Sequence, residues 1–486
     1  MAPIIIPLAL YLVGLFLLTY YSSRYLNRAA LKGTFIEEYF IGGRSLGGFV
    51  LAMTLVATYT SASSFVGGPG MAYAQGLGWV LLSITQLPTA YITLAVLGKK
   101  FAIISRKINA LTLIDILRHR YKSDFVVIIG SLSIICFFVA IMTAQYIGGA
   151  RLFQAVTGYS YTVGLAIFAI AILFYVTIGG FRAVALSDSL QGAIMLIGTV
   201  VILIITILRG GGVENLMRGM YAVNPDLLTP FGVDGFISQG WIMGFWVLVG
   251  IGVIGLPQVS IRAMSYKNSA SMHRAMIIGT FTVGFLMLGM HLVGTFGRVL
   301  LPGIENPDLV MPRMTIEVLP PWAAGIFFAG PLAAIMSTVD SLLIMASATV
   351  VKDLYSNYIN PRTNNQQLQF YSLGITAILG VAAFLFALNP PDFLVWLNLF
   401  AFGGLQATFF WPTILGLYWK RANAYGAVAS MISGTVSFII FDTLSMRPLG
   451  SHHIVATLLI ALAAFIIVSL STPPPDHKII HKFWGI

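Results

Sequence analysis

The sequence predicts an all-α protein that crosses a membrane many times. Of its 486 residues, 58% are hydrophobic and 9% are charged, whereas a soluble domain is roughly 45 to 50% apolar and about 25% charged. Apolar stretches recur along the whole chain, and an apolar helix of about 20 residues crosses a bilayer. Inside lipid every backbone amide needs an internal partner, and long continuous apolar runs lack the alternation of a β-barrel. We therefore expect the spans to be helices.

Thirteen stretches have the length and composition of a membrane span. We place them at about 4–22, 46–72, 78–98, 125–150, 160–178, 188–208, 239–262, 272–297, 322–350, 368–388, 392–418, 424–444 and 453–471. An odd number of spans puts the two termini on opposite sides of the membrane. The connections between them are too short for a soluble domain.

The distribution of Lys and Arg predicts the orientation. With the N-terminus outside, the inner segments hold 21 of the 27 Lys and Arg residues, Arg262 among them, and the outer segments hold six. Positive charge is retained on the inner side of a membrane, so we expect the N-terminus outside and the C-terminus inside. The net charge of +11 then faces anionic lipid. Nucleic-acid binding fits less well because the basic residues are spread over many loops.

Two predicted spans contain helix-breaking sequences. The second carries ATYTSASSFVGGPG (57–70) and the seventh carries GIGVIGLP (250–257). Unwound backbone at membrane depth is tolerated where protein or a water-filled cavity satisfies it. The breaks lie five spans apart, and because five is odd, a duplicated five-helix unit inserts upside down the second time.

This inverted-repeat plan divides the chain into five parts. They are an extra helix with the first inner loop (1–45), a first five-helix repeat (46–210), an outer loop (211–238), a second five-helix repeat (239–421), and two C-terminal helices with a cytoplasmic tail (422–486).

The ninth predicted span, with AAIMSTVDSLL at 333–343, is rich in oxygen-bearing side chains. Hydroxyls of Ser337 and Thr338, together with carbonyls freed at a helix break, are ligands that suit a hard cation such as sodium. Ser and Thr in membrane helices also bond to their own helix or to a neighbouring one, and for an isolated pair this is the commoner situation.

Other polar residues at membrane depth need a partner or a function. Asp340 lies deep in the ninth span and Asp188 lies where the sixth span begins. A carboxylate is costly there, so ion handling is one interpretation and helix capping of Asp188 is another. His291 is interpreted as a packing residue. Plausible substrate contacts, which helix-to-helix hydrogen bonding explains equally well, are Gln86, Gln145 and Gln406.

Signatures of enzymes are missing from the sequence. It has no zinc-ligand spacing, no phosphate-binding P-loop and no nucleophile elbow. An enzyme, an organic cofactor and an ATP-driven pump are therefore not expected. Transport is then driven by an ion gradient, or the protein is a facilitator.

Six motifs in fixed order carry a resemblance to a known family. They are the broken second span with GGPG, GARLFQ (149–154), IGGFRAVALSDSLQG (178–192), GLPQVSIRAMSYK (255–267), AAIMSTVDS (333–341) and GLYWKRANAYGA (416–427). Over essentially its whole length the chain resembles the sodium:solute symporter family. The resemblance implies a LeuT-like core of five plus five helices after an extra first helix, in the bacterial inner membrane.

The resemblance also implies the residues that bind sodium. The site shared by family members uses carbonyls at the second-span break and oxygens of span nine, here Ala57, Thr60, Ala334, Ser337 and Thr338. Some members hold a second cation, for which the matching residues are Asp188, Ser337, Asp340 and Ser341. Asp340 stands where those members have a serine, so its role there is open.

For the solute, the candidate contacts are the serines of the polar run after the break, Ser61, Ser63 and Ser64, and the resemblance implies that Ser61 and Ser64 contact the substrate anion. Helix amides exposed at a break favour a carboxylate. The implied substrate is pantothenate, imported with sodium, and the alternatives are proline or a short monocarboxylate. A membrane sensor or channel is a further alternative, although a sensor would normally carry a soluble output domain and a channel would be insensitive to a sodium gradient.

Overall fold

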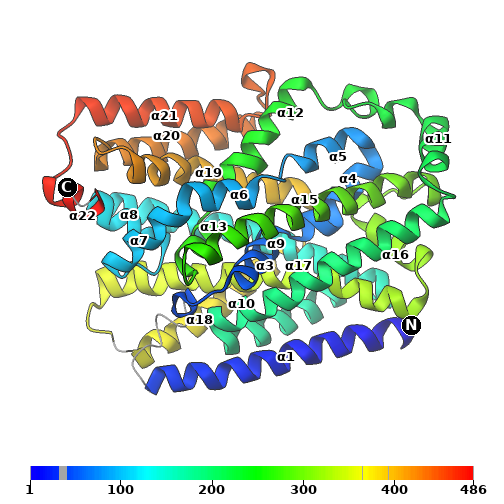
Figure 1. Ribbon diagram of the computed structural model, residues 1–486, viewed down its shortest axis with the longest axis horizontal. Coiled ribbons are helices and arrows are strands. Elements are labelled where there is room, and N and C mark those ends of the chain that lie inside the picture. The colour runs from blue at the N-terminus through cyan, green and yellow to red at the C-terminus, as the bar shows by residue number, and fades with distance from the viewer. Residues whose placement is uncertain (1, 32–40, 364, 392, 485–486) are drawn as a thin grey trace.

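The computed structural model describes residues 2–31, 41–363, 365–391 and 393–484. The described chain forms an elongated bundle of helices whose two ends lie at opposite ends of the bundle (Figure 1). In these ranges extended pairing is limited to an isolated β-bridge between Leu46 and Tyr266. The all-α prediction is confirmed.

The α-helices follow one another with short connections. In chain order they are α1 (Ala2–Leu31), α3 (Gly48–Tyr59), α4 (Gly68–Gln75), α5 (Leu77–Ile84), α6 (Thr89–Thr93), α7 (Lys99–Ile108), α8 (Leu113–Tyr121), α9 (Asp124–Thr157), α10 (Tyr161–Arg209), α11 (Val213–Val223), α12 (Gln239–Phe245), α13 (Pro257–Ser260), α14 (Arg262–Ser265), α15 (Ser269–Leu300), α16 (Val310–Val318), α17 (Pro321–Ala348), α18 (Asn365–Ala387), α19 (Leu394–Tyr418), α20 (Ala424–Thr443), α21 (Ile454–Ser471) and α22 (His477–Trp484). The π-helical and 3-10 segments used below are η2 (Ser63–Gly67), η6 (Trp246–Ile251), η7 (Gly252–Gly255), η8 (Pro307–Leu309) and η9 (Thr349–Ile359).

The prediction of many spans is confirmed. Within the described ranges, nine helices are long and apolar enough to cross a membrane, and two bent helix pairs bring the number to eleven. Two shorter apolar segments, Pro3–Leu17 and Tyr161–Leu173, lie at the first and fifth predicted spans. The count of thirteen and the N-out orientation stay predictions.

Both predicted helix breaks are confirmed. The pair Gly48–Tyr59 and Ser63–Gln75 is bent by 70°, and the pair Gln239–Gly255 and Pro257–Ser265 by 55°. The two breaks meet inside the bundle, where the Tyr59 hydroxyl donates to the carbonyl of Val249 at 2.7 Å. A side chain at the first break therefore satisfies a backbone carbonyl of the second broken span.

One predicted boundary differs from the structure. The spans at 160–178 and 188–208 fall in a single helical element, α10. Its first part packs against α9, where the rings of Phe168 and Tyr146 lie 5.9 Å apart, and its second part contacts α3 through Asp188. No proline separates the two predicted spans, so local sequence does not end the helix between them.

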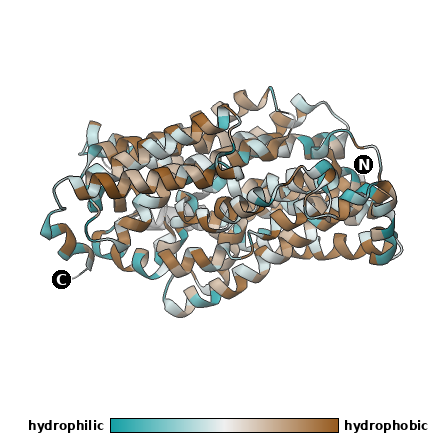
Figure 2. Cartoon of the chain, turned by 90° about the horizontal axis from the view of Figure 1, so that it is seen from above, coloured by the Kyte–Doolittle hydropathy of each residue, from teal (hydrophilic) through white to brown (hydrophobic). Residues whose placement is uncertain are grey.

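The outer surface of the bundle is apolar. Figure 2 shows hydrophobic residues along its flanks and hydrophilic residues gathered toward its ends. Large apolar side chains are widely exposed on the flanks, such as Phe281 at 76% and Ile170 at 69%. Exposure on this scale fits a surface that faces lipid.

Helix α17 runs through the centre of the bundle. In its span, 94% of the most apolar window is buried, and it contacts α10, α9, α1 and α18. Hydroxyls and carboxylates on this helix are therefore shielded from both lipid and water. They must find partners within the protein.

Candidate functional site

The helix break after α3 frees two backbone carbonyls. Helix α3 ends at Tyr59, and Thr60 takes an extended conformation with ψ of 137°. The N–H of Ser61 bonds to Ser64 Oγ at 3.4 Å, and the N–H of Ser64 bonds to the carbonyl of Ser61 at 2.9 Å. In an unbroken helix these two amides would bond to the carbonyls of Ala57 and Thr60. Serine hydroxyls favour the interruption because they compete for backbone groups.

Helix α17 supplies hydroxyls to the freed carbonyls. Ser337 Oγ donates to the Ala57 carbonyl at 2.9 Å, and Thr338 Oγ1 donates to the Thr60 carbonyl at 3.0 Å. The same two hydroxyls lie 3.1 Å and 2.9 Å from the carbonyl of Ala334. All five residues are buried. The structure thus brings together every residue of the first predicted sodium site.

These five oxygens form a neutral cluster that can hold a cation. Each hydroxyl has one hydrogen, so neither Ser337 nor Thr338 can satisfy two carbonyls fully at once. A cation among them would interact with lone pairs of all five oxygens, and neutral oxygen ligands suit a hard ion of low charge. Hydrogen bonding within the helix and cation binding are compatible interpretations of Ser337 and Thr338. Both hydroxyls lie close to a carbonyl of their own helix and also face the break.

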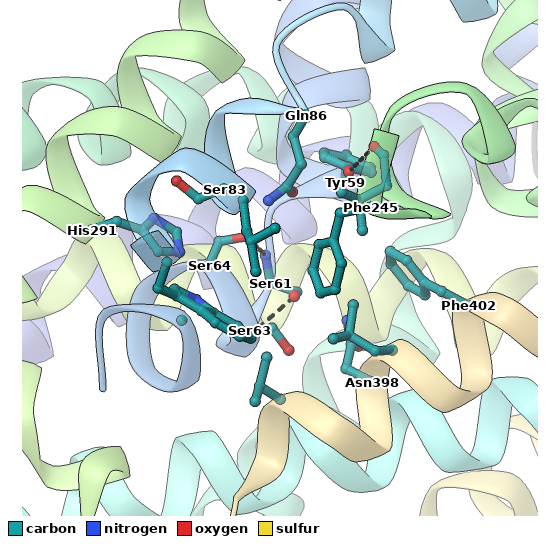
Figure 3. Close-up of a pocket in the computed structure, with 16 residues that line it drawn as sticks. Tyr59, Ser61, Ser63, Ser64, Ser83, Gln86, Phe245, His291, Asn398 and Phe402 are labelled. Carbon is teal, nitrogen blue, oxygen red and sulfur yellow. Dashed lines mark hydrogen bonds between the residues drawn. The ribbon is translucent and has the colours of Figure 1, made fainter. Parts of the chain in front are cut away.

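A cavity lies on the other side of the same break. It leaves about 40 Å³ for the centres of water molecules. Figure 3 shows Ser61, Ser63 and Ser64 at the break together with side chains from α5, α12, α15 and α19. The predicted contacts Ser61, Ser63, Ser64 and Gln86 all line the cavity. The broken segment therefore borders the oxygen cluster through its carbonyls and the cavity through its hydroxyls.

The serine hydroxyls can donate into the cavity. Ser61 Oγ accepts from the N–H of Ser63 at 3.2 Å, and Ser64 Oγ accepts from the N–H of Ser61. Among the described residues, Ser63 Oγ has no hydrogen-bond partner. Backbone amides near the break were expected to hold an anion directly, but those of Ser61 and Ser63 already bond to hydroxyls. A serine hydroxyl that accepts from a backbone amide still has its own hydrogen. It can donate that hydrogen to a ligand in the cavity.

The other two predicted glutamines lie behind the cavity wall. Gln145 Oε1 accepts from the N–H of Ala62 at 2.7 Å, and its Nε2 lies 3.5 Å from Asn398 Oδ1. Gln406 Nε2 donates to the carbonyl of Leu248 in the second break at 2.6 Å. Both side chains therefore satisfy backbone groups at the two breaks, and the cavity is lined by neither of them.

Comparison with known proteins decides the family. Residues 39–434 match the model of the sodium:solute symporter family. The chain belongs to the sodium:solute symporter family. It is 50% identical over 465 residues to the sodium/pantothenate symporter of Escherichia coli (strain K12), covering 96% of this chain and 95% of the relative. It is 30% identical over 491 residues to the osmoregulated proline transporter OpuE of Bacillus subtilis (strain 168), covering 99% and 97%.

Membership in the sodium:solute symporter family makes the chain a multi-pass transport protein of the plasma membrane and not an enzyme. A solved structure of a Na⁺-coupled sialic acid symporter in a substrate-bound outward-open state matches with a TM-score of 0.77 at 21% identity. The match covers 98% of this chain and 99% of that one. It shows that the two proteins share a fold.

Several cavity residues of this symporter were not predicted from the sequence. His291 was interpreted as a packing residue, yet it lines the cavity, as Figure 3 shows. Its Nδ1 lies 2.6 Å from the carbonyl of Met287. A carbonyl oxygen can only accept, so Nδ1 carries the hydrogen and Nε2 of the neutral ring is an acceptor. The other missed polar residues are Asn398 and Ser83, and the missed aromatic ones are Tyr59, Trp79, Phe245 and Phe402.

An acidic residue fixes the start of α19, the helix that brings Asn398 to the cavity. Asp308 in η8 is buried, and its Oδ2 accepts from the N–H of Leu394 at 3.4 Å. Burial raises the pKa of this carboxyl to about 6, while the Leu394 N–H and the charge of Arg151 act in the opposite direction. Near neutral pH the carboxylate form predominates, and it interacts favourably with a helix N-terminus.

The second predicted cation site shares Ser337 with the first; its Asp340 and Ser341 lie one turn further along α17, and its Asp188 lies on α10. Ser341 Oγ is 3.4 Å from Thr58 Oγ1, and both Asp188 and Asp340 are fully buried. Arg262 reaches into this group, with Nη2 2.7 Å from Ser341 Oγ and 3.7 Å from Asp188 Oδ2. From the sequence, Arg262 was expected to be one of the charges of an inner segment. The structure instead buries it, because α13 and α14 follow the second break within the bundle.

The placement of Gln406 gives a testable distinction between structural and substrate-binding glutamines. Replacing Gln406 by Leu leaves the Leu248 carbonyl without its donor, which costs about 1–3 kcal/mol. We expect a lower melting temperature and a smaller transport capacity, with a KM for the solute within about twofold of wild type. Gln86→Leu, which changes the cavity wall, should raise KM and leave the melting temperature unchanged. A raised KM in Gln406→Leu together with a lowered melting temperature in Gln86→Leu would contradict the structural role of Gln406 and the substrate-binding role of Gln86.

Proposed function

We propose that this protein is a sodium-coupled symporter that imports pantothenate by alternating access across the bacterial inner membrane. The observation that carries the proposal is the contact of the Ser337 and Thr338 hydroxyls with the freed carbonyls of Ala57 and Thr60. It provides a buried group of neutral oxygens beside a polar cavity. The relative from Escherichia coli, whose name is sodium/pantothenate symporter, supports both the ion and the substrate.

In this proposal sodium binds to the oxygen cluster and stabilises the broken segment. The ion takes over the lone pairs of both carbonyls, so the hydroxyls of Ser337 and Thr338 can turn their hydrogens away. Sodium thereby holds the segment after the break in position. Because the serines that face the cavity belong to the same segment, sodium binding orders the substrate site, and the two ligands bind cooperatively.

The cavity chemistry fits pantothenate, which has one carboxylate, two hydroxyls and one amide. The hydroxyls of Ser61, Ser63 and Ser64 can donate to the carboxylate, and Gln86 can donate or accept. Among the residues that the structure describes, no lysine or arginine lines the cavity, so in this proposal the bound sodium supplies positive charge beside the anion. His291 Nε2 offers an acceptor for a hydroxyl or amide hydrogen of the substrate.

The size of the cavity supports alternating access. A volume of about 40 Å³ corresponds to roughly three waters at 10 to 15 Å³ each, so pantothenate enters when the lining helices separate. In our proposal the two inverted five-helix units, 46–210 and 239–421, move relative to each other. The extra helix (1–45), the outer loop (211–238) and the C-terminal part (422–486) lie outside these units, and the N-terminus faces outward.

The coupling is tested by uptake of labelled pantothenate into proteoliposomes. We expect accumulation against a gradient when sodium is imposed outside, and equilibration or less when choline replaces it. Accumulation that is independent of sodium would contradict the proposal. Unlabelled proline serves as the competitor, because a relative at 30% identity is a proline transporter. Stronger competition by proline than by pantothenate would reassign the substrate.

His291 allows a prediction about substrate selectivity. Replacing it by Leu removes one acceptor from the cavity, and a lost hydrogen bond of about 0.5–1.5 kcal/mol raises KM for pantothenate roughly 2- to 13-fold. A pantothenate analogue without hydroxyls should be transported equally by both proteins if the imidazole binds a hydroxyl. An equal loss for both substrates would indicate a packing role for His291.

A further inference from the structure

A wide cavity at one end of the bundle is lined mainly by basic side chains. It leaves about 500 Å³ for the centres of water molecules, compared with about 40 Å³ in the cavity at the helix break. Its fixed cations are Arg118, Lys122, Lys478 and Lys482. They belong to α8, to the connection before α9 and to α22, which lie at the end of the bundle where the chain ends (Figure 1). In the proposed orientation this end faces the cytoplasm.

Helix α22 is docked on α8 by contacts that leave its lysines free to face the cavity. The guanidinium carbon of Arg120 in α8 lies 5.2 Å from the ring centre of Trp484 and 5.9 Å from that of Phe483. A cation over an aromatic face is attracted to it. Lys478 and Lys482 are four residues apart, so they lie on the same face of the helix. The C-terminal helix therefore brings two cations to the basic residues of α8.

Positive charges outnumber negative ones around this cavity. Lys122 Nζ lies 3.8 Å from Asp476 Oδ2, and Asp124 supplies a carboxylate to the lining. In the part of the chain that the structure describes, neither Lys478 nor Lys482 forms an ion pair with an acidic side chain. The four cations and these two carboxylates leave an excess of two positive charges. Because like charges held in one cavity repel each other, an anion there would be stabilising.

The donors around the cavity suit a phosphate group. Arg118 Nη1 donates to Asn357 Oδ1 at 2.6 Å, and the other N–H groups of its guanidinium have the geometry to bind two oxygens of one phosphate. Ser123 also lines the cavity and caps α9, with its Oγ accepting from the N–H of Val126 at 3.5 Å. Its own hydrogen remains available to an anion. The amino end of α9 favours negative charge at the same place.

An apolar strip on α9 begins beside the cavity. Phe125, Ile128 and Leu132 follow one another at helical spacing and are exposed to 70%, 42% and 53%. Helix α9 is long and apolar enough to cross a membrane, so this strip faces acyl chains. A phospholipid with its phosphate in the cavity would lay its acyl chains along the strip. A free phosphate ion would use the cavity alone.

We propose that this cavity binds the phosphate group of an anionic phospholipid of the cytoplasmic leaflet, and that α22 completes the site. The inference does not depend on which solute is transported. Arg118 joins the lipid to Asn357 in η9, which directly continues α17. The lipid thereby fixes α8, α22 and the end of the helix that carries Ser337 and Thr338.

Titration of the purified full chain with phosphatidylglycerol in a neutral detergent tests the site, with the melting temperature as the readout. We expect the melting temperature to rise to a plateau. A lysine near an anionic lipid contributes a factor of about five to binding, so replacing Lys478 and Lys482 together by Gln should raise the Kd about 30-fold. An unchanged Kd would overturn the proposal.

A matched pair of lysines separates a specific site from general attraction to an anionic surface. Lys99 and Lys107 are exposed on α7 at the same end of the bundle and lie outside the cavity. Replacing both by Gln removes the same charge and should leave the Kd unchanged. An equal loss of affinity in the two double variants would overturn the assignment.

The source of the phosphate is distinguished by sn-glycerol 3-phosphate, which has a phosphate group and no acyl chains. At the concentrations at which phosphatidylglycerol stabilises the protein, it should leave the melting temperature unchanged. Equal stabilisation by both compounds would identify a free phosphate compound as the ligand and overturn the assignment to a lipid. Phosphatidylcholine, whose headgroup has no net charge, should bind more weakly than phosphatidylglycerol, and equal binding would contradict recognition by the excess positive charge.

Discussion

Replacing Ser337 and Thr338 together by Ala is expected to abolish the activation of pantothenate uptake by sodium. Each hydroxyl contributes one of the five oxygens around the proposed ion. A hydrogen bond to a charged group contributes about 1.5–3 kcal/mol, and we take the contact of one hydroxyl with the ion to be of similar strength. Losing it would lower the sodium affinity roughly 10- to 160-fold. Each single variant should therefore need more sodium for half-maximal uptake. The double variant should show no response within the usable range of sodium concentration.

The control for this experiment is another buried hydroxyl on the same helix. Ser347 Oγ donates to the carbonyl of Ser372 at 2.9 Å, away from the break. Ser347→Ala removes a comparable hydrogen bond between α17 and its neighbour, so it should lower stability alone and keep the sodium dependence. If Ser347→Ala shifted the sodium dependence as strongly as the site variants, or if the site variants kept it, the proposed ion site would be wrong.

Gly68→Ala is expected to close the substrate cavity from the side of the broken helix. A Cβ at this position would lie 2.3 Å from His291 Nε2 and 2.7 Å from the carbonyl of Ser63. Overpacking of this kind costs about 1–3 kcal/mol, and here it displaces either the imidazole or the π-helical segment that presents the serines. We expect KM for pantothenate to rise by at least about tenfold. The sodium cluster contains neither residue and should keep its affinity.

A glycine with open space at its Cβ position provides the matched control. At Gly374 in α18 an added Cβ would meet nothing within 4 Å, and Ala is favoured over Gly in a helix. Gly374→Ala should therefore transport normally. Direct sodium binding in detergent, measured for Gly68→Ala, separates a closed cavity from a misfolded protein. Loss of sodium binding together with substrate binding would show that the substitution disrupts the whole break.

Local sequence signals were sufficient to predict the helix breaks. A run of hydroxyl side chains followed by Gly67, Gly68 and Pro69 weakens a membrane helix whatever the helix packs against. The glycines before Pro257 weaken the other broken helix in the same way. The pairing of Ser337 with Ala57 was implied by the family resemblance alone. The two residues are 280 positions apart, and such a contact depends on how helices pack and leaves no periodic signal in either segment.

The environment of single polar residues could not be predicted for the same reason. Arg262 occupies an inner segment by sequence, and its burial arises because α14 follows a broken helix back into the bundle. Gln145 and Gln406 were grouped with Gln86 since all three lie at membrane depth. Their different roles depend on which backbone groups the two breaks leave free beside them. His291 was missed because a histidine within a span more often packs than binds.

In the proposed mechanism, one interrupted helix binds sodium through its carbonyls and the solute through its hydroxyls. Calorimetric titration of the purified protein with pantothenate at several sodium concentrations tests it most directly. We expect the Kd for pantothenate to fall as sodium rises, and the Kd for sodium to fall by the same factor when pantothenate is saturating. A pantothenate affinity that stays the same when choline replaces sodium would contradict the account.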